Sequence, residues 1–151
     1  MEVKRVVYLA GAIRGEREAW EEMREIARWL SAFPNVEVFG EHVGALEIVD
    51  RVRPASEIER RDIIWLDQAT HVIAEISGAS TGTGREIEYA RTKHLFGKVK
   101  ANILCVYRKE REFHASPMIR GMDSDRYPNI VIKPYMGTWH VLDIIMDFLD
   151  L

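Results

Sequence analysis

The sequence predicts an α/β fold in which a five-stranded parallel sheet, of the flavodoxin-like or Rossmann-like type, carries helices on both faces. Short apolar runs rich in β-branched residues alternate with helical periodicities along the chain. The length of 151 residues and the hydrophobic content of 47% suit a single domain, residues 1–151, with a substantial core. Right-handed crossovers between successive parallel strands complete the prediction.

The first half of the sequence alternates strand and helix signals before a long loop. Residues 6–10 form a continuous apolar run, which is typical of a strand buried on both faces. Apolar residues recur at three- and four-residue spacing over residues 20–30 and predict a helix, and residues 36–39 predict the second strand. Residues 40–55 show no period, so we expect a long loop that has room for one helical turn.

A helix, a strand and a glycine-rich loop come next. Ser56, with Glu59 three residues later, matches a capping box and predicts a helix that extends to about Gln68. Residues 70–76 predict the third strand, and the Gly, Ser and Thr residues of 78–84 predict a loop.

The last third of the chain continues the alternation. A helix is predicted over residues 85–97, strands over 102–107 and 129–132, and a final helix over 139–149. Residues 108–128 are irregular, and a helical turn is expected near Met118.

Charge and composition argue against several classes of protein. Lys and Arg total 21 against 24 Asp and Glu, and the net charge of −3 disfavours general nucleic-acid binding, which needs a clustered positive surface. No segment approaches the ~20 apolar residues of a membrane-spanning helix. Cys105 has no partner for a disulfide, so we expect a reducing compartment, the cytoplasm.

Two glycine-bearing loops are expected to share a crevice. They follow the first and third strands, between which the strand order reverses in a flavodoxin-like sheet. In the loop at residues 11–15, glycine amides can approach a phosphate and Arg14 offers a planar fork for its oxygens. An ordinary tight turn with a solvated arginine explains this local sequence equally well.

Glu86 is the first candidate for chemistry in this crevice. It either completes a capping box with Thr83 or projects into the crevice as a carboxylate nucleophile. A free glutamate already ionises near pH ~4.3, so we expect Glu86 to need positioning and no special activation.

Asp62 is the second candidate, because it falls on the apolar stripe of its helix, four residues after Ile58 and three before Trp65. An inward carboxylate is paired, for example with Arg14 or Arg120, or it is functional. A functional Asp62 either donates a proton, which requires a raised pKa, or stays ionised and orients a substrate.

Other polar residues carry weaker signals. The histidines lack metal-ligand spacing and there is no cysteine pair, so no metal site is predicted. His42 is a candidate only through its place in the long loop, and Ser116 and Met118 have no local signature.

Five segments that occur in one order together resemble the 2′-deoxynucleoside 5′-phosphate N-hydrolases of the nucleoside 2-deoxyribosyltransferase superfamily. They are residues 8–15, 41–43, 62–66, 80–86 and 116–121, and the resemblance covers about residues 5 to 135. No single segment is specific to the family, whereas the ordered set is.

The resemblance implies a role for each matching residue. Glu86 matches the nucleophile that attacks C1′ of the sugar, Asp62 the acid near the sugar hydroxyls and departing base, and Tyr8 the tyrosine that orients the nucleophile and crowds the 2′ position. The positions that match phosphate and substrate contacts are Gly11, Ile13, Arg14, Gly15, His42, Ser80 and Gly82. Ser116 and Met118 match residues delivered from the neighbouring subunit of a homodimer.

Three positions bear on the subfamily. Related nucleoside transferases carry an acid at the Ser80 position, which would repel a phosphate, and related ribonucleotide hydrolases tend to carry phenylalanine at the Tyr8 position. Ala12 stands where the best-known hydrolases have a serine touching phosphate, and the lost bond is worth about 1.5–3 kcal/mol.

The resemblance therefore implies hydrolysis of the N-glycosidic bond of 2′-deoxynucleoside 5′-monophosphates through a covalent intermediate on Glu86, without a metal or organic cofactor. Two alternatives stay open: base exchange by a deoxyribosyltransferase, and nucleotide binding without catalysis on the same fold.

Overall fold

The computed structural model describes residues 3–45, 50–123 and 125–151 and confirms the expected α/β fold. Within these residues, parallel strands form a five-stranded sheet in the order β2-β1-β3-β4-β5, which is the flavodoxin-like order. The strands are β1 (Arg5–Ala10), β2 (Val36–Phe39), β3 (His71–Glu75), β4 (Asn102–Arg108) and β5 (Ile130–Tyr135).

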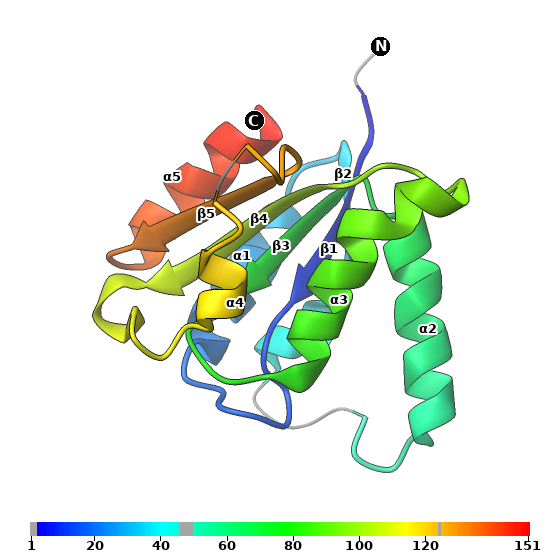
Figure 1. Cartoon of the computed structure of the whole chain (residues 1–151), viewed down its shortest axis with the longest axis horizontal. Coiled ribbons are helices and arrows are strands. Elements are labelled where there is room, and N and C mark those ends of the chain that lie inside the picture. The colour runs from blue at the N-terminus through cyan, green and yellow to red at the C-terminus, as the bar shows by residue number, and fades with distance from the viewer. Residues whose placement is uncertain (1–2, 46–49, 124) are drawn as a thin grey trace.

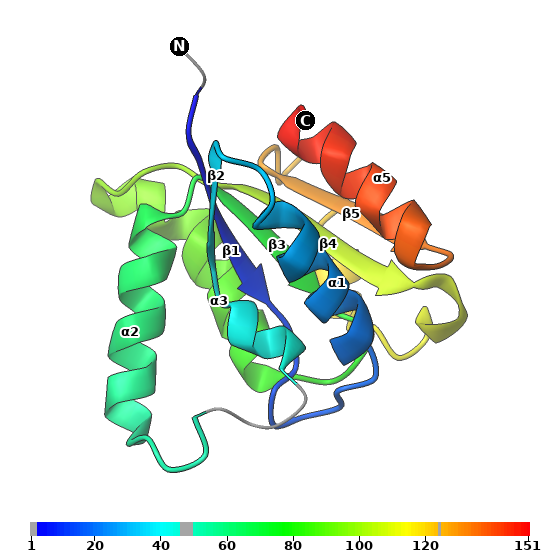
Figure 2. The same ribbon diagram turned by 180° about the vertical axis from the view of Figure 1, so that it is seen from behind.

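Helices cover both faces of the sheet. Figure 1 shows α2 (Ala55–Gln68), α3 (Thr81–Thr92) and the short α4 (Pro117–Arg120) in front of the strands. The view from behind in Figure 2 shows α1 (Trp20–Leu30) and α5 (Thr138–Leu149) on the opposite face. Short 3-10 helices η1 (Glu41–Gly44), η2 (Lys93–Phe96) and η3 (Lys109–Arg111) follow β2, α3 and β4.

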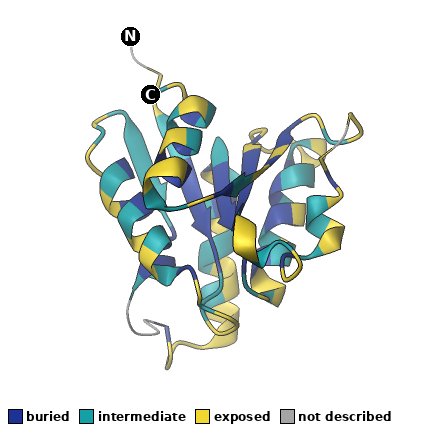
Figure 3. Ribbon diagram, turned by 90° about the vertical axis from the view of Figure 1, so that its left-hand side faces the viewer, coloured by how far each residue is buried: buried dark blue, intermediate teal, exposed yellow. Residues whose placement is uncertain are grey.

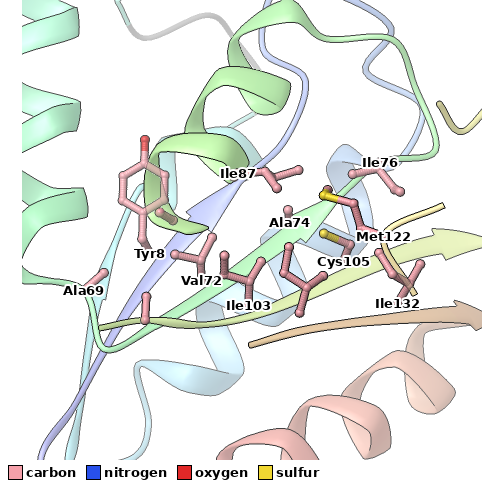
Figure 4. Packing of buried hydrophobic residues seen from close by; sticks show 14 of the residues in the cluster. Tyr8, Ala69, Val72, Ala74, Ile76, Ile87, Ile103, Cys105, Met122 and Ile132 are labelled. Atoms are coloured by element: carbon pink, nitrogen blue, oxygen red, sulfur yellow. The ribbon is translucent and has the colours of Figure 1, made fainter. Parts of the chain in front are cut away.

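The central strands are buried on both faces, which explains their continuous apolar runs (Figure 3). Side chains alternate along each strand, so Tyr8 and Ala10 pack toward α3 while Val7 and Leu9 pack toward α1. These two sets of side chains belong to separate hydrophobic clusters, of which the first is drawn in Figure 4.

Two expected helix starts are wrong, because other residues cap the helices. α3 begins at Thr81 and not near residue 85, since the Ser80 hydroxyl oxygen accepts the N–H of Thr83 at 3.2 Å as an N-cap. Thr83 is thus inside the helix, which rules out the capping box that was one of the two alternatives for Glu86. α2 begins after Pro54, whose carbonyl accepts the first helical N–H groups, so the expected capping box at Ser56 is also wrong.

Elsewhere the differences are smaller. β5 extends to Tyr135 through Pro134, which an edge strand tolerates because a missing N–H can face outward. The helical turn expected near Met118 is α4, and the turn expected within residues 40–55 is η1. Residues 46–49 of that predicted loop lie outside the described residues.

Candidate active site

A cavity of about 670 Å³ lies between α2 and α3, at the carboxyl ends of β1 and β3 where the strand order reverses. Its volume is in the range of pockets that hold a small-molecule ligand. The sequence-predicted residues that line it are Gly11, Ile13, Arg14, Gly15, Asp62, Ser80, Gly82 and Glu86. The two loops singled out from the sequence therefore share this cavity, and their roles in binding remain predictions.

The loops after β1 and β3 are joined by direct backbone contact. The N–H of Glu16 donates to the carbonyl of Ala79 at 3.1 Å. A Cβ atom added to Gly15 would lie 2.1 Å from the carbonyl oxygen of Ala79, and one added to Gly78 would lie 2.1 Å from that of Glu16. Both positions exclude any side chain, so the glycines allow the two loops to form one continuous wall.

One end of the cavity is suited to an anion. The Ser80 oxygen accepts from the N–H of Thr83 and, at 2.9 Å, from its hydroxyl, which leaves the Ser80 proton to be donated elsewhere. The amides of Thr81 and Gly82 lie in the first turn of α3, where N–H groups lack helical carbonyl partners and the helix dipole attracts negative charge. Arg14 lines the same cavity, and its Nη2 donates to the Asp50 carbonyl at 2.9 Å.

Glu86 projects from α3 one turn after Gly82, and its Oε1 lies 4.0 Å from the Cβ position of that glycine. Burial raises the pKa of Glu86 to about 8, with a further contribution from the negative charge of Asp62. The hydrogen bond from Tyr8 and the charge of Arg85 act in the opposite direction. The expectation that this glutamate ionises like a free one was therefore wrong, because it depended on an exposed carboxylate.

Tyr8 supports the Glu86 carboxylate from within β1. Its ring is 2% exposed and stands beside α3, with the hydroxyl directed away from the strand (Figure 4). Burial and the negative charges of Glu86 and Asp62 raise the pKa of Tyr8 well above its usual range. The phenol thus stays protonated and donates its hydrogen bond to Glu86.

Asp62 is paired, but with neither of the expected arginines. Its Oδ1 accepts from Nε and Nη2 of Arg61 at 2.9 and 2.8 Å. Arg14 instead donates to the Asp50 carbonyl, and Arg120 donates to the carbonyl of Ala115 at 2.9 Å.

His42 is not among the described residues that line the cavity. Its Nε2 lies 3.4 Å from Nη2 of Arg61 and 3.9 Å from Oδ2 of Asp50. Burial and the positive charge of Arg61 lower the pKa of His42, so the imidazole is mostly neutral at pH 7. His42 therefore lies outside the cavity lining, next to Arg61 and to Asp50, and Asp50 is itself a lining residue.

Ser116 and Met118 also lie away from the cavity of their own chain. They belong to the segment around α4, on the far side of α3 from α2 (Figure 1), and neither lines the cavity. The Met118 side chain is 83% exposed. Of the two residues expected to serve a neighbouring subunit, Met118 is therefore exposed and Ser116 is half-buried.

Sequence reasoning missed several charged residues of the site. Asp50, Arg53, Glu59 and Arg85 also line the cavity, and Nη2 of Arg85 lies 3.1 Å from Oε1 of Glu59, so this ion pair joins α3 to α2. Asp50 and Arg53 were marked only by their position in the long loop and Arg85 only by its position next to Glu86, whereas Glu59 was interpreted as part of a capping box. Among the described residues, no three acidic, His or Cys side chains cluster as metal ligands, and no helix is long and apolar enough to cross a membrane.

Known proteins share both the sequence and the fold, although no family model matches the chain. A protein of Nematostella vectensis, whose name assigns it to the 2′-deoxynucleoside 5′-phosphate N-hydrolases, is 34% identical over 150 residues, which cover 97% of this chain and 95% of that protein. The Homo sapiens 5-hydroxymethyl-dUMP N-hydrolase is 36% identical over 126 residues, 80% of this chain and 68% of that protein. The structure of the Clostridium botulinum CMP N-glycosidase BcmB has the same fold, with a TM-score of 0.68 at 16% identity over 95% of this chain and 99% of that one. The chain belongs to the 2′-deoxynucleoside 5′-phosphate N-hydrolase family.

Proposed function

We propose that this protein hydrolyses the N-glycosidic bond of 2′-deoxynucleoside 5′-monophosphates and releases the free base and 2-deoxyribose 5-phosphate. The observation that carries the proposal is a half-buried carboxylate, Glu86, one helical turn from a helix start suited to an anion, within one cavity. The names of the relatives supply the bond and the substrate class.

The phosphate binds at the start of α3. Ser80 donates its hydroxyl proton, the amides of Thr81 and Gly82 donate N–H groups, and Arg14 supplies positive charge. An acid at position 80 would bring a second negative charge against the phosphate, so the serine favours nucleotides over nucleosides.

Phosphate binding at this point brings C1′ of the sugar to Glu86. The carboxylate attacks C1′, the C–N bond breaks with its electron pair on the base, and an ester between C1′ and Glu86 results. Water then attacks C1′, the Glu86 carboxylate leaves, and the proton of the water is lost to solvent. Tyr8 holds the carboxylate in place. The departing base takes its proton either from a protonated Asp62 or from solvent, and in the second case an ionised Asp62 accepts a hydrogen bond from a sugar hydroxyl.

The raised pKa of Glu86 fits this chemistry. A poorly solvated carboxylate is a stronger nucleophile than one in water, and its negative charge is stabilised when positive charge develops at C1′ in the transition state. Tyr8 adjoins the same carboxylate. The family resemblance assigns it the further role of crowding the 2′ position, which would favour the deoxy sugar.

The proposal includes a homodimer in which Ser116 and Met118 complete the cavity of the partner subunit. It is supported by the absence of both residues from the described lining of their own cavity and by the 83% exposure of Met118. The buried free thiol of Cys105 is compatible with a reducing compartment such as the cytoplasm.

The decisive assay incubates the purified protein with deoxynucleoside monophosphates, ribonucleoside monophosphates and deoxynucleosides and follows base release. We expect turnover of the deoxynucleoside monophosphates and little of the others. Turnover of deoxynucleosides alone would reject the phosphate site, and formation of a new nucleotide when a second free base is added would favour base exchange.

A mixing experiment tests the dimer. Glu86→Gln lacks the nucleophile, and Met118→Asp places a charge where the partner's substrate would bind. Equimolar mixing of the two inactive variants should restore activity, because each heterodimer contains one intact site. Mixtures that stay as inactive as their components would argue that the cavity is complete within one chain.

A further inference from the structure

We infer that Arg61 is a positioning residue for this hydrolysis. Its guanidinium fixes the orientation of the Asp62 carboxylate relative to the sugar of the substrate. The inference rests on the proposed function. Arg61 is not among the described residues that line the cavity, whereas Asp62 is, so any effect of Arg61 on the reaction must pass through another residue.

The guanidinium of Arg61 connects several polar groups of the cavity wall. Nε and Nη2 both donate to Oδ1 of Asp62, and Nη2 also lies 2.8 Å from Oδ2 of Asp50 and 3.4 Å from Nε2 of His42. Its side chain is 21% exposed and that of Asp50 is 7% exposed. These bonds are therefore shielded from water, where charged hydrogen bonds are strongest.

The contact between Arg61 and Asp62 does not follow from helix geometry. Adjacent residues of a helix point about 100° apart and do not face each other. The guanidinium bends toward Asp62 because it lies over the Trp65 ring, 4.6 Å from the centroid, and because Asp50 holds its other side. Trp65 in turn stacks on Phe39 at 5.5 Å with planes 7° apart, so the support extends to the end of β2.

This arrangement determines how Asp62 meets the substrate. The two donors of Arg61 occupy Oδ1, and no hydrogen bond within the described residues engages Oδ2. Oδ2 is thus the oxygen offered to the substrate, and rotation of the carboxylate would cost the paired bonds to Oδ1. Arg61 also forms ion pairs with both Asp50 and Asp62 and so links these two carboxylates.

A double-mutant cycle tests the inference. Arg61→Gln should lower kcat roughly 10- to 100-fold and change KM by less than about threefold, because orientation is lost and phosphate binding is not. If Arg61 acts through Asp62, adding Arg61→Gln to Asp62→Asn should cost less than about twofold beyond Asp62→Asn alone. Guanidinium ion at millimolar concentration should restore part of the activity of Arg61→Gly and none of that of Asp62→Asn.

Arg91→Gln provides the matched control. Arg91 pairs with Glu88 and lies over the Tyr127 ring at 5.4 Å, on α3 but outside the cavity, so its loss should leave kcat unchanged. A folded Arg61→Gln with kcat within twofold of wild type, or fully additive losses in the cycle, would overturn the inference while leaving the proposed function intact. If the wild-type protein releases no base from any nucleotide, the proposed function is wrong, and the inference about Arg61, which rests on it, is wrong as well.

Discussion

Two glutamates lie on opposite faces of the sheet, each beside a tyrosine; Glu75 is buried, whereas Glu86 is half-buried and borders a large cavity. Glu75, at the end of β3, is 4% exposed and accepts the Tyr135 hydroxyl at 2.8 Å as well as the N–H of Ser77. It adjoins a space of about 10 Å³, room for about one water molecule. Glu86 accepts the hydroxyl of Tyr8 and borders the cavity of about 670 Å³.

The difference shows that burial alone does not make a glutamate reactive. Burial raises the pKa of both carboxylates. In Glu75 the hydrogen bonds from Ser77 and Tyr135 engage both carboxylate oxygens and no substrate could reach them, so the residue joins β3 to β5. In Glu86 the same desolvation operates, but the cavity leaves the carboxylate accessible to a sugar carbon. Access is what we expect to separate a structural from a catalytic glutamate here.

The largest effect should come from replacing each glutamate by glutamine. Glu86→Gln removes the nucleophile and should lower kcat about 10³-fold or more, while Glu75→Gln should leave kcat within a few-fold of wild type. Base release from a deoxynucleoside monophosphate measures both variants under one set of conditions. Comparable losses in the two proteins would mean that the comparison misassigns the catalytic carboxylate.

The next effect concerns the anion site, which only the Glu86 side of the sheet possesses. Ser80→Asp should lower kcat/KM for deoxynucleoside monophosphates roughly 100-fold and that for deoxynucleosides much less, because the new charge repels a phosphate. Aspartate is also a good N-cap, so the start of α3 should persist. Ser80→Ala serves as the control for loss of the hydroxyl alone. Equal losses of kcat/KM on deoxynucleoside monophosphates and on deoxynucleosides would show that the phosphate does not bind at Ser80.

The pH dependence of the reaction should show an effect of roughly tenfold per pH unit. The reaction needs the Glu86 carboxylate, whose pKa is raised to about 8, so kcat/KM should rise as pH increases toward that value and level off above it. The phosphate itself ionises near pH ~6 and is distinguishable. Tyr8→Phe removes a hydrogen bond that lowers the pKa of Glu86 and should move the profile to higher pH, whereas Tyr135→Phe should not. A profile that is already flat below pH 6 would contradict the raised pKa.

The fold was predictable from the sequence because β1, β3 and β4 are buried on both faces and leave continuous apolar runs. Topology then placed the loops after β1 and β3 at one crevice, and these loops do share the cavity. Helix starts were less predictable, since Ser80 and Thr83 both have the residue type of an N-cap and only the backbone path decides between them.

Two features of the site depend on tertiary structure and left no pattern in the sequence. The pKa of Glu86 reflects how much solvent α3 and Tyr8 exclude, which no local spacing encodes. The pairing of Arg61 with Asp62 depends on Trp65 and Asp50, because adjacent helix residues ordinarily diverge. The apolar stripe of its helix and the family resemblance both pointed to Asp62, but neither carried information about what holds it.

The smallest effect is on stability, and it should have opposite signs for the two glutamates. The pKa of Glu86 is raised to about 8 from a usual value of 4.5, so its contribution to stability is complete below pH 4.5 and is lost as pH rises through 8. Glu86→Gln should therefore be more stable than wild type at pH 9, by roughly 1–3 kcal/mol after allowance for water in the cavity, and nearly equal to it at pH 4. Glu75→Gln should instead be less stable than wild type at pH 9, where Glu75 is ionised, because an amide cannot accept both bonds that Ser77 and Tyr135 donate to the carboxylate. Thermal unfolding of the three proteins at the two pH values measures this, and a Glu86→Gln variant that is destabilised at pH 9 would show that the charged carboxylate contributes to the fold as Glu75 does.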